Sequence, residues 1–322
     1  MSKTLTEESR AALYEATLRS LQAEVKELPA VWLYDERGSR LYEEITRLPD
    51  YYLPRREGEI LRARAATIAG RTQASMLVEL GAGNAKNTRL LLDALESAGT
   101  LERFVPLDVS EQTLRESAEQ IAAAYPGISV EPIVGDFERD LDLLPAGGRR
   151  LIAFLGRTVG NLYPDQRASL LTALAEALAP GDALLLGVDL VKDVARLEAA
   201  YNDPQAVTEA FVRNALAAVN GELDATFEQR RFVYDAHWDP EHEWMDIGLR
   251  AREAHTVRVH ELELDVAFEA GEPVRIEISA KFRRESFELE AARAGLRVES
   301  WWTDRAGDFA VALLFPDPFA GS

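Results

Sequence analysis

Cysteine is absent from this sequence of 322 residues, and histidine occurs only four times. The absence of cysteine excludes disulfides, thiolate metal ligands and a cysteine nucleophile. The histidines lie in a polar, charged stretch without a clear ligand spacing, so we interpret them as surface residues and expect no metal; they are His237, His242, His255 and His260. The sequence also lacks both an apolar run of about 18 residues and a signal-peptide core, which predicts a soluble, cytoplasmic protein with no membrane partner.

Positive charge is scarce as well. The 36 Lys and Arg residues stand against 55 Asp and Glu residues, which gives a formal net charge of −19. Such a surface repels nucleic-acid phosphates, so we expect no nucleic-acid partner and favour a small-molecule substrate. The hydrophobic content of 47% is ordinary for a globular chain, and 322 residues can bury one large core or two smaller ones.

The most informative motif is a glycine loop after a predicted buried strand, Met76–Leu80. Gly81 and Gly83 let the backbone turn sharply and approach a ligand closely at the mouth of a parallel sheet. A dinucleotide-binding loop would carry a third glycine at position 86, where this sequence has Lys86. The loop therefore indicates a ligand other than a pyrophosphate, or a structural turn with no ligand.

Carboxylates follow the next two predicted strands. Asp108 ends the strand that begins near Arg103, where an acid can accept hydrogen bonds from both hydroxyls of a ribose. Asp136 and Phe137 follow the third strand, and an acid beside an aromatic ring suits the amine and the face of an adenine. Either Asp could instead cap a helix, which is the commoner role of Asp in such loops. The three features in this order favour a nucleoside cofactor pocket.

Short apolar segments alternate with helical ones from residue 75 to residue 188, which is typical of βαβ units and a parallel sheet. The expected strands are Met76–Leu80, Phe104–Asp108, Val130–Val134, Arg150–Leu155 and Ala183–Val188. The expected helices between them are Asn87–Ala98, Glu111–Ala124 and Asp165–Ala179. The pattern predicts an α/β fold with a doubly wound core.

Beyond Asp193 this alternation stops. Residues 194–220 have a helical pattern, and antiparallel strands are expected at residues 232–252, 256–269 and 274–281. The chain then returns through a helix to a closing pair of strands, 296–301 and 309–315. We therefore expect a core of residues 61–192 and 282–322, and an α+β substrate-binding domain of residues 1–60 and 193–281.

The segment after the fourth strand carries candidate substrate contacts. It faces the crevice where a substrate would meet the cofactor, and it contains Gly156, Thr158 and Asn161. The side chain of Asn161 offers both a donor and an acceptor. The alternative role for Asn161 is to cap the helix that starts near Pro164.

Segments along nearly the whole chain resemble one enzyme family. Glu79 to Gly83 is similar to motif I of the class I S-adenosylmethionine-dependent methyltransferases. The chain from about Pro29 to Phe315 resembles the L-histidine Nα-methyltransferases of the ergothioneine pathway, in these segments: 32–35, 45–52, 135–138, 154–162, 189–193, 281–283 and 301–304. The resemblance implies a Rossmann-like methyltransferase core that uses S-adenosylmethionine, releases S-adenosylhomocysteine, and trimethylates the α-amine of L-histidine to give hercynine.

The resemblance also implies roles for individual residues. Cofactor contacts are implied for Gly81, Gly83, Lys86, Asn87, Asp108, Asp136 and Phe137, with Tyr34 near the sulfonium end. Asn161 and Tyr201 match positions that bind the substrate carboxylate, and Tyr34 and Asn161 are the implied catalytic residues. The implied imidazole contacts are Tyr51, Ile247, Glu277 and Ser279. Glu277 and Ser279 lie two residues apart on a predicted strand, so their side chains share one face.

Two positions depart from the family pattern. Asn87 stands where the family often has a lysine, with Lys86 adjacent, and Ile247 followed by Gly248 stands where a methionine is expected. The second change leaves open another aromatic substrate such as tryptophan. The alternative from another functional class is a non-catalytic regulatory protein that binds S-adenosylmethionine. We also expect the protein to be a monomer.

Overall fold

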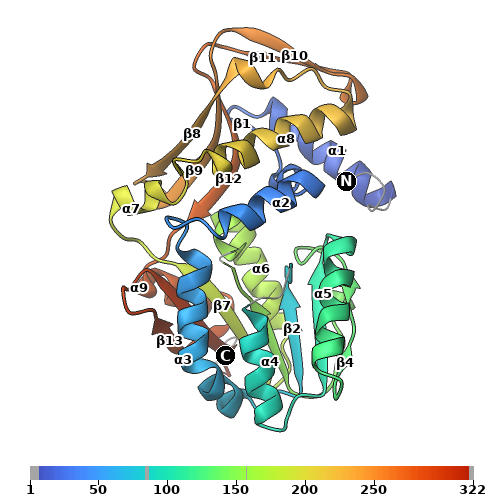
Figure 1. The fold of residues 1–322 in the computed structure, drawn as a ribbon, viewed down its shortest axis with the longest axis vertical. Coiled ribbons are helices and arrows are strands. Elements are labelled where there is room, and N and C mark those ends of the chain that lie inside the picture. The colour runs from blue at the N-terminus through green and yellow to red at the C-terminus, as the bar shows by residue number, and fades with distance from the viewer. Residues whose placement is uncertain (1–6, 84–86, 157, 319–322) are drawn as a thin grey trace. The chain divides into compact units, whose positions relative to one another are not determined.

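The computed structural model describes residues 7–83, 87–156 and 158–318, and it has the expected α/β class. The chain divides into two compact units, whose elements are labelled in Figure 1. Unit 1 comprises the described residues up to Tyr52 together with Lys192–Ala280. Unit 2 comprises Leu53–Val191 and the described residues from Lys281 onward.

The described strands of unit 2 form one eight-stranded sheet in the order β13-β14-β7-β6-β2-β3-β4, with β5 also paired to β3. The strands are β2 (Met76–Leu80), β3 (Arg103–Asp108), β4 (Ser129–Val130), β5 (Ile133–Val134), β6 (Arg150–Phe154), β7 (Ala183–Asp189), β13 (Leu296–Thr303) and β14 (Phe309–Pro316). Strands β2 to β7 pair in parallel, whereas β14 is antiparallel to both of its neighbours. The predicted doubly wound core is confirmed, with a reversed closing strand.

The helices of unit 2 are α3 (Leu53–Thr72), α4 (Thr88–Ser97), α5 (Glu111–Ala124), α6 (Pro164–Ala177) and α9 (Arg284–Arg293), with 3-10 turns η2 (Leu141–Leu143) and η3 (Thr158–Asn161). Every residue of β2, β6 and β7 is buried, as in parallel sheets that are covered on both faces. α3 packs on α4 and β14, α5 packs on β3, and α9 packs on β13.

The order of the strands reverses beside β2, because the chain runs from β2 outward to β3 and later crosses back to β6. In open α/β sheets, ligands bind beyond the carboxyl ends of the strands at such a reversal. The loops after β2, β3, β5 and β6 therefore meet at the edge where a ligand is expected.

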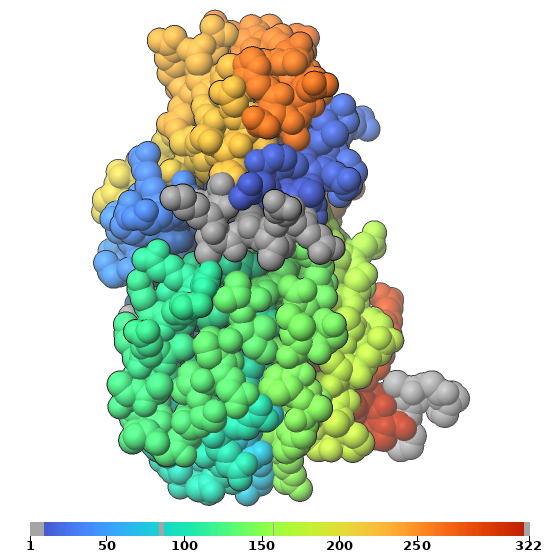
Figure 2. Space-filling view, turned by 90° about the vertical axis from the view of Figure 1, so that its right-hand side faces the viewer, coloured from blue at the N-terminus to red at the C-terminus, as the bar shows by residue number. Residues whose placement is uncertain are grey.

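Unit 1 is built on a four-stranded sheet in the order β1-β12-β9-β8, with β10 and β11 as a separate hairpin. The strands are β1 (Lys26–Glu27), β8 (Phe232–Asp239), β9 (Trp244–Ala251), β10 (His255–Val259), β11 (Leu264–Phe268) and β12 (Pro273–Ala280). The helices are α1 (Glu7–Gln22), α2 (Glu36–Ile45), α7 (Val194–Ala199) and α8 (Val207–Leu223), with 3-10 turns η1 (Ala30–Leu33), η4 (Gln229–Arg231) and η5 (His260–Leu262). α8 packs against α2 and η1, and α1 packs against β1 and β11, which places the dark blue helix beside the orange hairpin in Figure 2.

Three expectations about the elements need correction. Residues 53–60 belong to unit 2, because they begin α3; the other two domain boundaries each differ by one residue. The helix expected at 194–220 is two helices, because Pro204 interrupts it. The Asp203 carboxylate accepts from the backbone N–H groups of Val207 and Thr208 in the first turn of α8, each at 2.8 Å. The strand expected at 130–134 is two short pieces, β4 and β5, each paired with β3.

The histidines also differ from expectation in one case. The ring of His255 stacks on Phe268, with centroids 5.5 Å apart, and meets Phe232 edge-on at 5.1 Å. It is therefore part of an aromatic cluster rather than a plain surface residue. Among the described residues, no group of His, Asp and Glu side chains is arranged to hold a metal ion. In the same residues, no helix is long and apolar enough to cross a membrane.

Candidate functional site

The glycine loop joins β2 to α4 and is held by the neighbouring strand. Gly81 and Gly83 have φ angles of +66° and +48°, a conformation that favours glycine. The backbone N–H of Gly81 donates to the carbonyl of Leu107 at 2.8 Å, at the end of β3. A Cβ on either glycine would meet no atom of the described residues within 4 Å, so bare backbone is presented at this point of the loop. This fits a small ligand that lies against the backbone; Lys86 lies outside the described residues.

Asp108 ends β3 beside this loop. Its carboxylate accepts hydrogen bonds from the backbone N–H groups of Gly83 at 2.9 Å and Ser110 at 2.8 Å. Burial raises the pKa of Asp108, and these hydrogen bonds oppose that rise. Each carboxylate oxygen has further acceptor capacity, so Asp108 can hold the loop and still bind hydroxyl groups of a ligand.

Asp136 and Phe137 follow β5. The carboxylate of Asp136 accepts from the backbone N–H of Glu138 at 3.0 Å and pairs with the guanidinium of Arg139 at 3.0 Å. The ring of Phe137 packs on Phe154 at the end of β6, with centroids 4.8 Å apart. Asp136 therefore stabilises a turn at residues 137–139 and does not cap a helix, and the half-buried Phe137 ring remains available for stacking.

A buried carboxylate that the sequence did not single out links two of these loops. Glu57 on α3 is 2% exposed, and it accepts from the backbone N–H of Gly156 at 2.7 Å and from the side-chain amide of Asn87 at 2.8 Å. Gly187 on β7 makes room for it, since a Cβ there would lie 2.3 Å from Glu57 Oε1. Burial raises the pKa of Glu57, and the two hydrogen bonds oppose the rise. Glu57 thus holds the start of α4 and the loop after β6 together.

This arrangement bears on the expected role of Asn87. The Asn87 amide also donates to the carbonyl of Pro54 at 3.1 Å, so both of its N–H groups are directed to α3. Asn87 therefore acts within unit 2 as a bridge to Glu57. The signal for Glu57 was present in the sequence: it occupies the position between Leu53 and Leu61 on the buried stripe of a helix, where an apolar residue is expected.

Glu79 lies one residue before the end of β2 and is 4% exposed. The hydroxyl of Thr88, at the start of α4, donates to its Oε1. Burial raises the pKa of Glu79 to about 8, and the charges of Glu57 and Asp108 add to the rise. Glu79 is therefore held in its neutral form at pH 7 beneath the glycine loop.

The loop after β6 carries Gly156, Thr158 and Asn161. Thr158 Oγ1 donates to the carbonyl of Leu155 at 3.4 Å, and Thr158–Asn161 form the 3-10 turn η3. The N-cap of α6 is Tyr163, so the alternative role of Asn161 as the cap of that helix is wrong. Asn161 is half-buried at the carboxyl edge of the sheet.

Several aromatic rings of unit 1 pack against one another. Tyr34 packs edge-on against Tyr42 and Phe211, with centroids 5.8 Å and 5.5 Å apart. Tyr51 meets Tyr201 edge-on at 6.3 Å, and both rings are buried.

Glu277 and Ser279 on β12 form the polar part of the same region. They are 7% and 1% exposed, and their paired residues on β9 are Ile247 and Met245. The Tyr201 hydroxyl donates to Ser279 Oγ at 2.8 Å. Unit 1 therefore brings together an aromatic ring, a carboxylate and a hydroxyl, beside the apolar side chain of Ile247.

A second tyrosine that the sequence did not single out supports this group. The Tyr234 hydroxyl on β8 donates to the backbone carbonyl of Tyr201 at 2.6 Å. Burial raises the pKa of Tyr234 well above its usual value, with smaller contributions from the charges of Asp203 and Glu277. The neutral phenol is therefore a fixed hydrogen-bond donor that holds the backbone at Tyr201.

Comparison with known proteins identifies the family of this chain. The chain matches the family model of the histidine-specific, S-adenosylmethionine-dependent methyltransferases over residues 13–316. It is 50% identical over 302 residues to histidine N-alpha-methyltransferases of Mycolicibacterium smegmatis and Mycobacterium tuberculosis, covering 94% of this chain and 94% of each relative. It is 31% identical over 286 residues to ergothioneine biosynthesis protein 1 of Neurospora crassa, covering 86% of this chain and 32% of that longer protein. The chain therefore belongs to the family of histidine-specific methyltransferases that depend on S-adenosylmethionine.

Proposed function

We propose that this protein transfers methyl groups from S-adenosylmethionine to the α-amine of L-histidine, three in succession, to give hercynine in ergothioneine biosynthesis. Family membership supports the reaction class and the amino-acid substrate. The buried pair Glu277 and Ser279 is the observation that favours histidine over other amino-acid substrates, because a carboxylate and a hydroxyl complement the two nitrogens of an imidazole.

Residues of unit 2 are proposed to bind the cofactor. The bare backbone at Gly81 and Gly83 admits its amino-acid part, the Asp108 carboxylate accepts from the ribose hydroxyls, and the Phe137 ring packs on the adenine. Asp136 is proposed to accept from the adenine amine while it keeps its turn contacts.

Residues of unit 1 are proposed to recognise the histidine side chain. The Glu277 carboxylate accepts a hydrogen bond from one imidazole nitrogen, and Ser279 meets the other. Tyr51 and Ile247 contact the faces and edge of the ring. Since the Tyr201 hydroxyl donates to Ser279 in the structure, binding a substrate carboxylate through Tyr201 requires that proton to be redirected.

Gly156, Thr158 and Asn161 of unit 2 are proposed as further substrate contacts. The Asn161 amide donates to the carboxylate of histidine. The Glu57 carboxylate fixes the backbone of Gly156, so the position of this loop does not depend on the ligand alone.

Methyl transfer requires the protein to align the amine with the methyl group of the cofactor, and it does not require a covalent intermediate with the protein. The cofactor supplies a methyl group on a sulfonium sulfur, and the neutral α-amine attacks the methyl carbon in line with the leaving sulfur. Tyr34, with Asn161, is proposed to orient the amine. The product carries a fixed positive charge, which the faces of Tyr34 and Tyr51 can accommodate by cation–π attraction.

The decisive test is a competition assay with equimolar histidine and tryptophan and S-adenosylmethionine as methyl donor. Glu277→Ala should reduce histidine turnover by roughly tenfold to a hundredfold, the range for loss of a charge-assisted hydrogen bond, and should raise the share of tryptophan product. Asp235→Ala is the matched control, since Asp235 lies on β8 of the same sheet, paired with Gly248 on the opposite face.

An unchanged product ratio in Glu277→Ala would remove the support for imidazole recognition. Methylation of tryptophan but not histidine by the wild type would identify the alternative substrate, and no methylation by a protein that binds S-adenosylhomocysteine would identify a regulatory protein. A monomer is also proposed, and light scattering on the full chain tests it.

A further inference from the structure

Strand β12 contains an irregularity directly before Glu277. Arg275 pairs with Gly248 of β9, but Glu277 pairs with the next residue, Ile247, so Ile276 is an extra residue opposite the β9 strand. Such a β-bulge reorients the side chains that follow it, and bulges are common beside active sites.

The bulge decides which face Glu277 occupies. In a regular strand, residues two apart share a face, so Arg275 and Glu277 would point the same way. Here they point to opposite faces, because Arg275 shares the face of Asp246 and Gly248, while Glu277 shares that of Ile247. We call the first the clamp face and the second the pocket face, which also carries Ser279.

A regular register, with Ile276 paired in the ladder, would exchange these positions. With Arg275 still opposite Gly248, Ile276 would pair with Ile247 and Glu277 with Asp246. A one-residue slip moves every following side chain to the other face. Ile276 and Ile278 would then occupy the pocket face, and two carboxylates would stand opposite each other on the clamp face.

Gly248 permits the bulge. A Cβ built on Gly248 would lie 2.3 Å from the carbonyl oxygen of Val274 and 3.0 Å from the Cα of Arg275. Both neighbours are backbone atoms of β12, so they cannot move away without shifting the strand. The close approach of the two backbones at this point therefore requires glycine.

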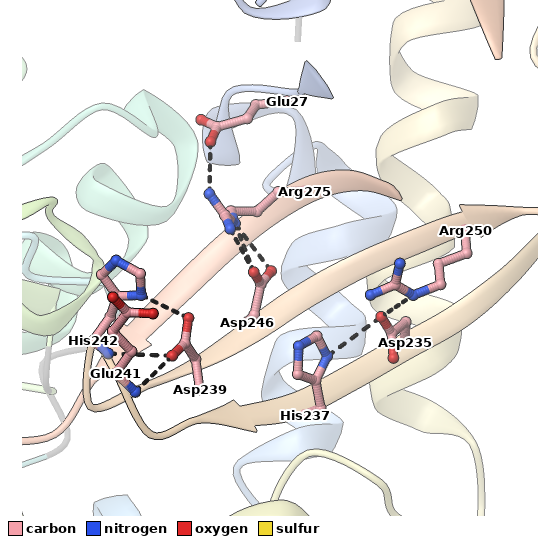
Figure 3. A network of polar contacts seen from close by, with 9 residues as sticks. All are labelled: Glu27, Asp235, His237, Asp239, Glu241, His242, Asp246, Arg250 and Arg275. Carbon is pink, nitrogen blue, oxygen red and sulfur yellow. Dashed lines mark hydrogen bonds and ion pairs between the residues drawn. The ribbon is translucent and has the colours of Figure 1, made fainter. Parts of the chain in front are cut away.

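Arg275 holds the bulged strand from the clamp face, as Figure 3 shows. Its guanidinium donates to both oxygens of Asp246 on β9, with contacts of 3.0 Å from Nε and 2.5 Å from Nη2, and to Glu27 on β1 at 3.0 Å. The side chains of Arg275 and Asp246 are each only 18% exposed, so solvent screens this pair less than a surface pair. The contacts join β12 to the strands on both of its sides.

We propose that Gly248 and Arg275 are specificity-determining positioning residues, which hold the β12 bulge and so direct Glu277 to the pocket face. The inference rests on the proposed role of Glu277 in binding imidazole. Gly248, next to Ile247, thereby influences which amino-acid side chain the protein accepts, and it does so without contacting the substrate.

The test uses the full-length variants Arg275→Met and Gly248→Ala. Each should raise the KM for histidine by about tenfold, the scale expected when one charge-assisted hydrogen bond is weakened, and should lower the preference for histidine over tryptophan. The affinity for S-adenosylhomocysteine should stay unchanged, because the expected cofactor contacts, Tyr34 and the residues of unit 2, all lie outside β9 and β12. That pattern separates a displaced Glu277 from general unfolding.

Arg250→Met is the matched control. Arg250 also lies on the clamp face of β9 and pairs with Asp235 at 2.6 Å, visible in Figure 3, but its register partner on β12 is Pro273, outside the bulge. It should leave the KM for histidine and the product ratio unchanged. If Gly248→Ala fails to fold, as circular dichroism would show, Arg275→Met decides the question.

Glu277→Ala, measured beside them, distinguishes the two possible failures. If Glu277→Ala impairs histidine use and Arg275→Met matches the wild type, the positioning role is refuted and the proposed function stands. If Glu277→Ala itself changes neither KM nor product ratio, the imidazole assignment fails, and the positioning role fails with it.

Discussion

Glu79 makes the stability of this protein depend on pH in a predictable direction. Its Oε1 accepts from the Thr88 hydroxyl, and its Oε2 is buried with no hydrogen-bond partner among the described residues. Burial raises the pKa of Glu79 from 4.5 to about 8 in the folded state. The substitution Glu79→Gln keeps the shape and the Thr88 contact but removes the ionisation.

The sign of the effect follows from proton binding. Between pH 4.5 and about 8, folded Glu79 keeps its proton whereas the unfolded chain has lost it, so the folded state binds more protons. The free energy of unfolding is therefore highest below the unfolded pKa and falls as pH rises through the folded pKa. At 1.36 kcal/mol per pKa unit, the whole loss is on the order of 5 kcal/mol.

The measurement is urea denaturation of the wild type and Glu79→Gln from pH 5 to pH 8, followed by tryptophan fluorescence. Glu79→Gln should lose less stability across this range than the wild type by roughly 3–5 kcal/mol. The control is Glu116→Gln, an exposed carboxylate on α5. If Glu79→Gln follows the same pH dependence as the wild type, Glu79 does not hold a proton in the folded state and the electrostatic reasoning is wrong.

Three further predictions concern binding and stability. Asp108→Ala should weaken S-adenosylhomocysteine binding by about 1–3 kcal/mol, measured by calorimetry, and unchanged affinity in a folded variant would contradict the ribose assignment. Histamine should be a poor substrate, because it would leave the proposed carboxylate ligands Asn161 and Tyr201 unpaired; turnover equal to that of histidine would refute that role. Lys281→Met should destabilise the protein by about 3–5 kcal/mol in urea denaturation, because the Lys281 ammonium lies 2.8 Å from Asp189 and both side chains are 0% exposed. A loss under about 1 kcal/mol would show that Asp189 is not left charged and buried.

Local patterns predicted the parts of this protein that depend on neighbours in sequence. The buried strand before Gly81, the carboxylate at the end of β3 and the strand that carries Glu277 and Ser279 all follow from short-range alternation and turn chemistry. The antiparallel direction of β14 relative to β7 is seen in the strand pairing, and alternation along β14 alone does not determine it.

Contacts between distant elements were not predictable in the same way. The position of Glu57 on the buried stripe of α3 is visible in the sequence, but its partner Gly156, which lies 99 positions away, is not. Residues 53–60 were assigned to the wrong unit for a related reason. The local pattern does not mark a boundary at Leu53, whereas the packing of α3 on α4 and β14 places these residues with the core.

The β12 strand shows where alternation itself reaches its limit. Read from Arg275, a period of two places Arg275, Glu277 and Ser279 on one face, which would put a guanidinium next to the proposed imidazole ligands. The bulge at Ile276 removes Arg275 from that face and keeps the other two together. The sequence of β12 alone does not predict the bulge, because the residue that permits it, Gly248, lies on β9. Under the proposed role of Glu277, the choice of substrate depends on the register between β12 and β9, and a change at Gly248 alters it while every proposed contact residue is unchanged.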